Sequence, residues 1–134
     1  MSADLETLAR RAVACKHWRW MPGMKVVWPN GNEFRVGQVT GIDGQNHLPN
    51  YPSNGWGDEF PDRTKGLPDF RDPATIGCLL ALVREAWVDL HMVAHCDDRY
   101  GKTVWWLSRW GDLPRSCECS TEAAALVAAL EAAP

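Results

Sequence analysis

Hydrophobic residues recur at helical spacing in three stretches of the chain: at about residues 3–15, at about residues 73–87 and after residue 120. Each stretch follows a residue type that caps helix N-termini, and the second begins with a proline, which suits the first helical position. We therefore expect three helices, with the central one buried against a sheet. The capping residues are Ser2, Asp72, and Ser120 or Thr121; the expected buried stripes are Leu5, Leu8, Ala9, Ala12 and Val13, then Ile76, Leu79, Leu80, Val83 and Trp87, then Ala123, Leu126, Val127 and Leu130.

Four further stretches have the composition or alternation of strands and are joined in pairs by turn-rich segments. Their order between the helices predicts an α+β domain, in which two antiparallel β-hairpins form a sheet with about three helices packed on it. Gly37 interrupts the second strand and indicates a bulge there. The first hairpin is predicted at residues 25–28 and 34–42 around the turn 29–32, and the second at residues 88–96 and 103–110 around the loop 97–102.

Residues 43–71 show neither the helical spacing nor the strand alternation of hydrophobic residues, and they contain four glycines and four prolines. A segment of this length without regular structure is commonly functional or disordered. Its aromatic residues, among them Trp56, argue against plain disorder, and its Asn, Ser and Gly content suits a protein-binding loop. The chain of 134 residues fits a single domain, residues 1–134, with this long irregular loop packed on the sheet.

Composition narrows the class of protein. Apolar residues make up 46% of the chain and charged residues 23%, which is typical of a globular protein. No apolar run reaches the roughly 18 residues of a membrane span, and the first residues lack the basic start of a secretory signal. The net charge of −3 argues against duplex nucleic acid as the leading partner. Five cysteines, an odd number, indicate thiols in a reducing compartment, so we expect a cytoplasmic protein with no membrane partner.

Three segments of the chain resemble those of a family of small, functionally uncharacterised proteins of tailed bacteriophages and prophages. The segments are residues 15–24 (CKHWRWMPGM), 72–87 (DPATIGCLLALVREAW) and 121–131 (TEAAALVAALE), and together they cover about a third of the chain. The resemblance implies a viral origin and expression in the cytoplasm of a bacterial host. It brings no catalytic residues, and the middle loop and the second hairpin lie outside it.

Metal and catalytic sites are not indicated by the spacing of the candidate residues. Cysteines and histidines supply enough donors for zinc, but no C-x2-C pair occurs. On one strand, His91 and His95 would lie about 13 Å apart and could not share an ion. The chain also lacks the nucleophile-elbow, phosphate-loop and dinucleotide-binding motifs. We expect no metal, no cofactor and no catalysis, with a zinc-stapled domain or a small enzyme as the weakest hypothesis. The ligands considered are Cys15, His17, His91, His95, Cys96, Cys117 and Cys119.

Tryptophan is the unusual feature of the composition, with eight residues against three Phe and two Tyr. A core of this size needs few, so we expect some on the surface, where the flat ring binds partners. Between Thr7 and Asn32 there are five basic residues and no acidic one, and tryptophans are interleaved with them. An arginine beside an indole suits a planar anionic ligand. The alternative is that Trp18 and Trp20 are core or cap residues, with the alkyl parts of the basic side chains lying along the surface. The binding residues expected from this pattern are Trp18, Arg19, Trp20, Trp56, Arg99, Tyr100, Arg109 and Trp110.

Two binding functions follow from these residues. In the first, a phage accessory protein inhibits a bacterial host defence protein through a Trp-rich surface; the choice of target is an analogy from origin. In the second, a sponge sequesters an anionic signalling nucleotide in a Trp/Arg pocket formed between copies of a homo-oligomer. The inhibitor requires its side chains to be spread over an exposed patch, whereas the sponge requires them to converge. Both require exposed tryptophans in the free protein.

Overall fold

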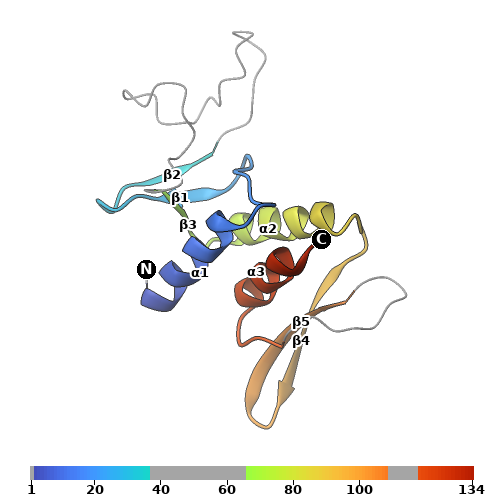
Figure 1. Cartoon of the computed structure of the whole chain (residues 1–134). Helices are drawn as coiled ribbons and strands as arrows, with labels where there is room; N and C mark the ends of the chain where they lie inside the picture. The colour runs from blue at the N-terminus through green and yellow to red at the C-terminus, as the bar shows by residue number, and fades with distance from the viewer. Residues whose placement is uncertain (1, 37–65, 109–117) are drawn as a thin grey trace.

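The computed structural model describes residues 2–36, 66–108 and 118–134. Three helices lie between a small sheet and a separate hairpin (Figure 1). The helices occur where the hydrophobic periodicity predicts them, and the α+β class and the order of the main elements are confirmed. The helices are α1 (Ala3–Ala14), α2 (Pro73–Ala86) and α3 (Glu122–Ala132).

The strands form two separate sheets, not the single sheet expected from the sequence. The first hairpin pairs with a short strand that was not predicted, and the pairings of the named strands are all antiparallel. This additional strand ends at Pro68, which has no backbone donor to extend the ladder. The predicted continuation to residue 42, the bulge at Gly37 and most of the loop 43–71 lie outside the described residues. The strands are β1 (Lys25–Val27), β2 (Glu33–Arg35) and β3 (Leu67–Pro68), ordered β2-β1-β3, and β4 (Val93–Arg99) with β5 (Lys102–Ser108).

Helix α3 lies at the centre of the hydrophobic core. Its side chains Leu126, Val127 and Leu130 are fully buried, as the predicted stripe requires. It packs against α1, α2 and both strands of the β4–β5 hairpin. The alanines on α3, of which Ala125 is fully buried, allow the neighbouring elements to approach it closely. The core is therefore built around this helix and not around a sheet.

The buried face of α2 differs by one position from the prediction. Leu79 and Val83 are buried as expected, but Leu80 is only partly buried and Leu82 takes its place with 1% of its surface exposed. Positions 79, 82 and 83 form one face of a helix at i, i+3 and i+4. They form the buried face because α2 packs against α3, and not against a sheet as the sequence suggested.

Asp72 joins the start of α2 to the three-stranded sheet. Its carboxylate accepts hydrogen bonds from the Thr75 N–H and hydroxyl, each at 2.9 Å, and forms a two-point ion pair with Arg35 at 2.8 and 2.9 Å. The Thr75 hydroxyl in turn accepts the Lys25 N–H at 2.8 Å. The hydrogen bonds from Arg35, more than those from Thr75, hold the pKa of Asp72 well below its usual value. The predicted cap is thus also the anchor between helix and sheet.

The second hairpin begins later and turns more tightly than predicted. Val88 does not start a strand, and β4 begins only at Val93. At the other end, Tyr100 and Gly101 alone connect the strands, with φ angles of 52° and 76°. Positive φ at both central residues is typical of a type I′ turn, which matches the twist of the flanking strands. Asp97 and its neighbours therefore belong to the strands and not to the loop expected from their polarity.

Candidate binding surface

The register of the β4–β5 hairpin gives each of its two faces a different environment. Residues directly opposite each other in an antiparallel pair lie on the same face. Ala94 is opposite Leu107, and both pack into the core. His95 is opposite Trp106 on the other face. We call this second set of side chains the hairpin face; it comprises Val93, His95, Asp97, Arg99, Lys102, Val104, Trp106 and Ser108.

Trp106 is held between an imidazole and a guanidinium on the hairpin face. The His95 ring stacks on it with a centroid separation of 5.4 Å and an interplanar angle of 19°. A hydrogen bond of 2.5 Å between His95 Nε2 and Ser108 Oγ fixes that ring. The Arg99 Cζ atom lies 5.2 Å from the Trp106 ring centroid, within the range of a cation–π contact. The indole is therefore fixed in place before any partner arrives.

The positive charge of Arg99 is balanced by carboxylates. Its guanidinium donates to Glu118 Oε1 at 2.8 Å and to Asp97 Oδ2 at 3.3 Å. Because both acceptors are largely exposed, these ion pairs add little stability, but they orient the guanidinium. The hairpin face is therefore aromatic and close to neutral around Trp106, and not a cationic pocket.

Residues 88–93 connect α2 to β4 and present apolar side chains to solvent; we call them the 88–93 segment. Val88 is 91% exposed and Leu90 is 80% exposed, while Met92 between them and the strand is buried. Val93, 44% exposed, is also the first residue of the hairpin face, so the two surfaces are continuous. Exposed apolar side chains that are grouped in this way mark interaction sites more often than isolated ones do.

The backbone of the 88–93 segment is held by hydrogen bonds. The Val88 and Asp89 N–H groups donate to Glu85 O at 3.1 Å and to Arg84 O at 2.9 Å, which is the Schellman pattern at the end of a helix. The Asp89 carboxylate accepts the His91 N–H at 2.9 Å. Val88 occupies the left-handed position of this motif with φ of 51°, where glycine is usual and a β-branched residue is strained. The Val88 side chain is exposed to solvent despite this strain.

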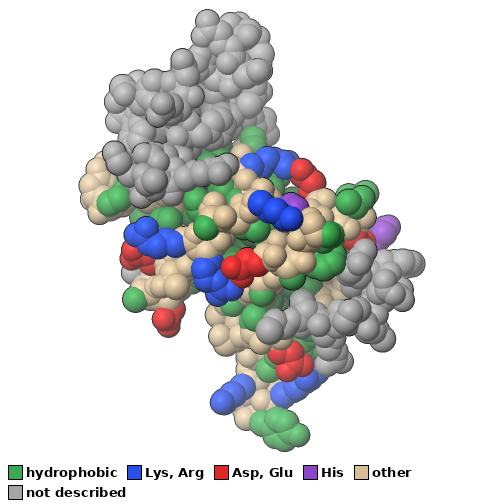
Figure 2. Space-filling view, in the orientation of Figure 1, with side chains coloured by type: hydrophobic (Ala, Val, Ile, Leu, Met, Phe, Trp, Pro, Cys, Tyr) green, Lys and Arg blue, Asp and Glu red, His purple; other side chains and the backbone are tan. Residues whose placement is uncertain are grey.

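Tyr100 completes the exposed apolar set at the turn of the hairpin. Its side chain is fully exposed, and the hairpin extends away from the helices (Figure 1). A hydrophobic side chain forms the end of the hairpin in the space-filling view (Figure 2). Tyr100 was predicted as a binding residue, and the structure places it where a partner can reach it.

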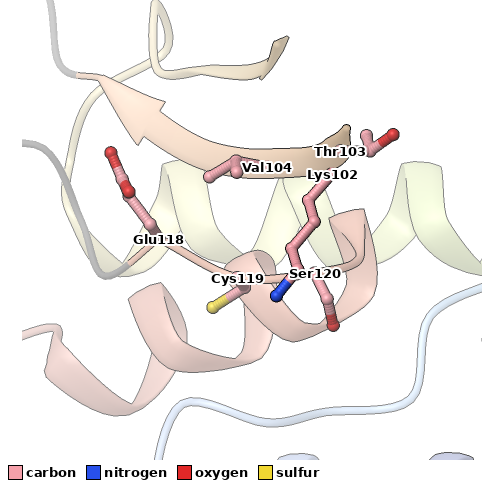
Figure 3. Close-up of a pocket in the computed structure, with 6 residues that line it drawn as sticks. All are labelled: Lys102, Thr103, Val104, Glu118, Cys119 and Ser120. Atoms are coloured by element: carbon pink, nitrogen blue, oxygen red, sulfur yellow. The ribbon is translucent and has the colours of Figure 1, made fainter. Parts of the chain in front are cut away.

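A shallow hollow of about 500 Å³ lies between β5 and residues 118–120 (Figure 3). Lys102 extends along it toward Ser120, and Glu118 lies at the other end. Glu118 already accepts the hydrogen bond from Arg99, and most of the lining residues are exposed. The hollow is therefore an extension of the open hairpin surface, and it does not enclose a small molecule.

The predicted patch around Trp18 is placed differently. Trp18 is only 3% exposed, and its ring packs edge-on against the partly buried Trp20 with centroids 5.3 Å apart. The indole N–H groups of Trp18 and Trp20 find no acceptor among the described residues. The prediction that Trp18 contacts a ligand is wrong, because the core encloses its side chain.

Four of the five basic residues of the same stretch pair with carboxylates in the fold. Arg19 pairs with Glu85, and Arg11 pairs with Glu131 from the far end of the chain. Arg10 pairs with Glu6, and Lys25 contacts two carboxylates. Basic and acidic side chains lie side by side on the visible surface (Figure 2). The run of positive charge in the sequence therefore forms no cationic patch in this region.

Three predicted binding residues, Trp56, Arg109 and Trp110, lie outside the described residues. Of the remainder, the structure brings Arg99 and Tyr100 to the hairpin and leaves the Trp18 region in or near the core. Sequence reasoning missed His95 and Trp106 as a pair. The signal was available, because a two-residue turn at Tyr100-Gly101 sets the register that places them opposite each other.

The candidate metal ligands are dispersed. The described parts of the chain contain no group of three or more His, Cys, Asp or Glu side chains that could hold a metal. Cys15, Cys78, Cys96 and Cys119 are not in disulfides, and the Cys15 thiol donates to Leu130 O at 3.4 Å. No described helix is both long and apolar enough to cross a membrane. No protein-family model, curated protein or solved structure matches the chain.

Proposed function

We propose that the protein acts by binding another protein, without catalysis, through the 88–93 segment and the hairpin face. The observation that carries this proposal is the exposure of Val88 and Leu90 on a backbone already held by its own hydrogen bonds. Apolar side chains fixed in this way lose little conformational freedom on binding, which favours affinity. Trp106 and Tyr100 extend the surface with the aromatic residues that dominate protein interfaces.

The state of the arginines favours a protein partner over a nucleotide. A sponge for an anionic nucleotide needs guanidinium groups that are free to take phosphate. Arg19 and Arg99, the described arginines of the predicted pocket, each donate to carboxylates instead. They also lie in different regions, since Arg19 contacts α2 and Arg99 contacts residue 118. An exposed, nearly neutral, aromatic and aliphatic surface suits a protein.

The resemblance to phage proteins gives the class of partner to test first. A small protein expressed from a phage in the bacterial cytoplasm meets host defence proteins there, so we propose that it inhibits one of them by covering a surface. The inhibitor would use Leu90, Val93 and Trp106 as apolar contacts. Arg99 and Glu118 would lie at the edge, where they orient the partner more than they add affinity.

Variants of Leu90 test this function. The wild-type chain, Leu90→Asp and the control Ala3→Asp, which alters an exposed residue in the first turn of α1, would each be used to capture proteins from host lysate. We expect a bacterial protein to bind the wild type and the control directly after purification. Its affinity for Leu90→Asp should be at least about thirtyfold lower, as for a central interface residue.

The same proteins distinguish the nucleotide alternative. Cyclic and linear nucleotides would be screened by thermal shift, with Arg99→Ala as the comparison variant. A stabilising nucleotide whose effect is lost in Arg99→Ala, together with no loss of protein capture in Leu90→Asp, contradicts the proposed function and supports the sponge.

A further inference from the structure

The outer edge of β4 has unused hydrogen-bonding groups. Trp105 N–H and C=O both pair with Cys119, at 2.7 and 2.8 Å, on the side of β5 away from β4. Cys96 is opposite Trp105, so the two residues form a non-hydrogen-bonded pair of the ladder, and the N–H and C=O of Cys96 point away from β5. Ala94 and Asp98 point the same way because the pattern alternates. Among the described residues, no backbone group pairs with these three.

We propose that β4 pairs antiparallel with β4 of a second copy of this chain, centred on Cys96. The two hairpins then form one sheet in the order β5-β4-β4-β5. The backbone hydrogen bonds of this interface come from the strand edge, although side chains that select its register, such as His95 and Asp97, belong to the hairpin face. The pairing does not require the partner of the proposed function. An exposed strand edge of this length is a template for another strand, and nothing on β4 blocks it with proline or lysine.

The charge pattern of β4 selects the second copy as the occupant. With Cys96 opposite Cys96, His95 is opposite Asp97 of the second copy, and Asp98 is opposite Ala94. Val93 is opposite Arg99, so no like charges face each other and all seven residues of the strand are paired. In this register the sequence VAHCDDR pairs with its own reverse without placing like charges opposite each other.

Neighbouring registers lack this complementarity. The outward groups belong to alternate residues, so the next allowed registers move the two-fold axis by one residue to Asp97 or to His95. The axis at Asp97 places two carboxylates opposite each other and sets His95 against Arg99. The axis at His95 places two imidazoles opposite each other and leaves Arg99 outside the pairing. Two carboxylates opposite each other weaken the pair centred on Asp97, and the pair centred on His95 joins fewer residues of the strand, so the Cys96 register is favoured.

The Cys96 register can be detected by a disulfide between the two copies of Cys96. The outward groups of Cys96 make it a hydrogen-bonded pair with its copy, with Cα atoms about 5.5 Å apart. That separation lies within the roughly 4.4–6.8 Å that a disulfide spans. The Cys96 side chain is exposed and free. An added copper–phenanthroline oxidant, which accepts two electrons as the two thiols lose their protons, should link the copies through Cys96.

Sedimentation equilibrium of the full chain under reducing conditions tests the pairing. We expect a monomer–dimer equilibrium, and oxidation should give a dimer whose linked peptides join Cys96 to Cys96 by mass spectrometry. Cys96→Ser should still dimerise but should not cross-link. Cys96→Lys, which places two ammonium groups at the axis, and Cys96→Pro, which removes the outward N–H, should each raise the dimer dissociation constant by at least about tenfold.

Two results would overturn the proposal. One is a monomer at every concentration reached. In that case the β4 edge pairs with a strand of a different protein or with no strand. The other is a dimer that Cys96→Lys and Cys96→Pro leave intact while circular dichroism shows the fold retained. The lysine variant guards against a proline that fails to fold, because it keeps the backbone N–H and alters only an exposed side chain. Host-protein capture by the Cys96→Lys variant, whose dimer should be weakened, separates a failure of this interface from a failure of the proposed function.

Discussion

In the region around α1, Trp18 lies in the core and its neighbour Arg19 pairs with Glu85, whereas in the β4–β5 hairpin Trp106 lies on an open face between His95 and Arg99. Both regions combine tryptophan with arginine in sequence. In the first, the ring fills the core and the guanidinium of the next residue pairs with Glu85 at the surface. In the second, the ring is partly buried on the face of the hairpin that points away from the core, so the same two residue types occupy different environments in the two regions.

The difference comes from what lies behind each tryptophan. Trp18 belongs to a cluster that includes Met24 and Val26, so burial of its large ring stabilises the fold. Behind the hairpin face there is only the width of a two-stranded ladder, with Leu107 directed to α3 on the opposite side. A residue pair in sequence therefore indicates binding only where its strand or helix turns it away from the core.

The largest expected effect is the loss of the buried ring. Trp18→Ala should reduce the free energy of unfolding by about 3–5 kcal/mol, because it removes a large buried side chain. Trp106→Ala should reduce it by about 1 kcal/mol, the scale of cross-strand contacts. Urea unfolding followed by circular dichroism measures both. Equal losses would show that the two regions do not differ as described.

A smaller contrast lies within α2. Leu82→Ala should cost about 2–5 kcal/mol because the side chain is enclosed between α2 and α3. Leu80→Ala should cost about 1 kcal/mol, since that side chain is only partly buried. The same unfolding experiment applies. A larger loss at Leu80 than at Leu82 would show that Leu80, and not Leu82, lies on the buried face of α2.

The contribution of Asp72 to the free energy of unfolding should depend on pH. Asp72→Ala should cost about 2 kcal/mol at pH 7, from the lost helix cap and ion pair. Because the pKa of Asp72 is depressed in the folded protein, its contribution is present above the unfolded pKa of about 4 and is lost as the pH falls below it. The difference between wild type and Asp72→Ala should therefore shrink at pH 3. A difference that stays constant between pH 7 and pH 3 contradicts the assignment.

The smallest effect is expected to be a gain of stability. Val88→Gly relieves the left-handed backbone, and after the greater freedom of glycine in the unfolded chain is subtracted it should stabilise the protein by about 0.5–1 kcal/mol. Val88→Ala keeps a side chain at positive φ and should gain less. If the 88–93 segment binds a partner, Val88→Gly should also lower the affinity while raising the melting temperature. A lower melting temperature would show that the Val88 side chain makes stabilising contacts despite its high exposed fraction.

The helices could be predicted because their signals are local. Asp72-Pro73 and Thr121 mark helix starts by their own chemistry, and the stripe on α3 is buried as its spacing requires. The neutralisation of the basic stretch could not be predicted, because Arg11 finds its carboxylate on Glu131 at the far end of the chain. Such pairs depend on how the helices pack, which no short window of sequence contains.

The hairpin shows a different limit. Asp97 and Asp98 have the polarity of loop residues, yet they form the exposed end of β4, where polar side chains are favourable on a strand that faces water. With the turn at Tyr100-Gly101, the alternate residues His95, Asp97 and Arg99 lie on one face of β4. The position of the turn could have been predicted from Tyr100-Gly101, if these residues had been given more weight than the polarity of Asp97 and Asp98.

The central position of α3 has a consequence for how the chain folds as it is made. Helices α1 and α2 and strands β4 and β5, which pack on α3, precede it in the sequence, so they emerge from the ribosome before it. Until Leu126 and Leu130 are available, the apolar faces of α1, α2 and the hairpin have no common partner. These elements can therefore complete their shared core only after α3 has been synthesised.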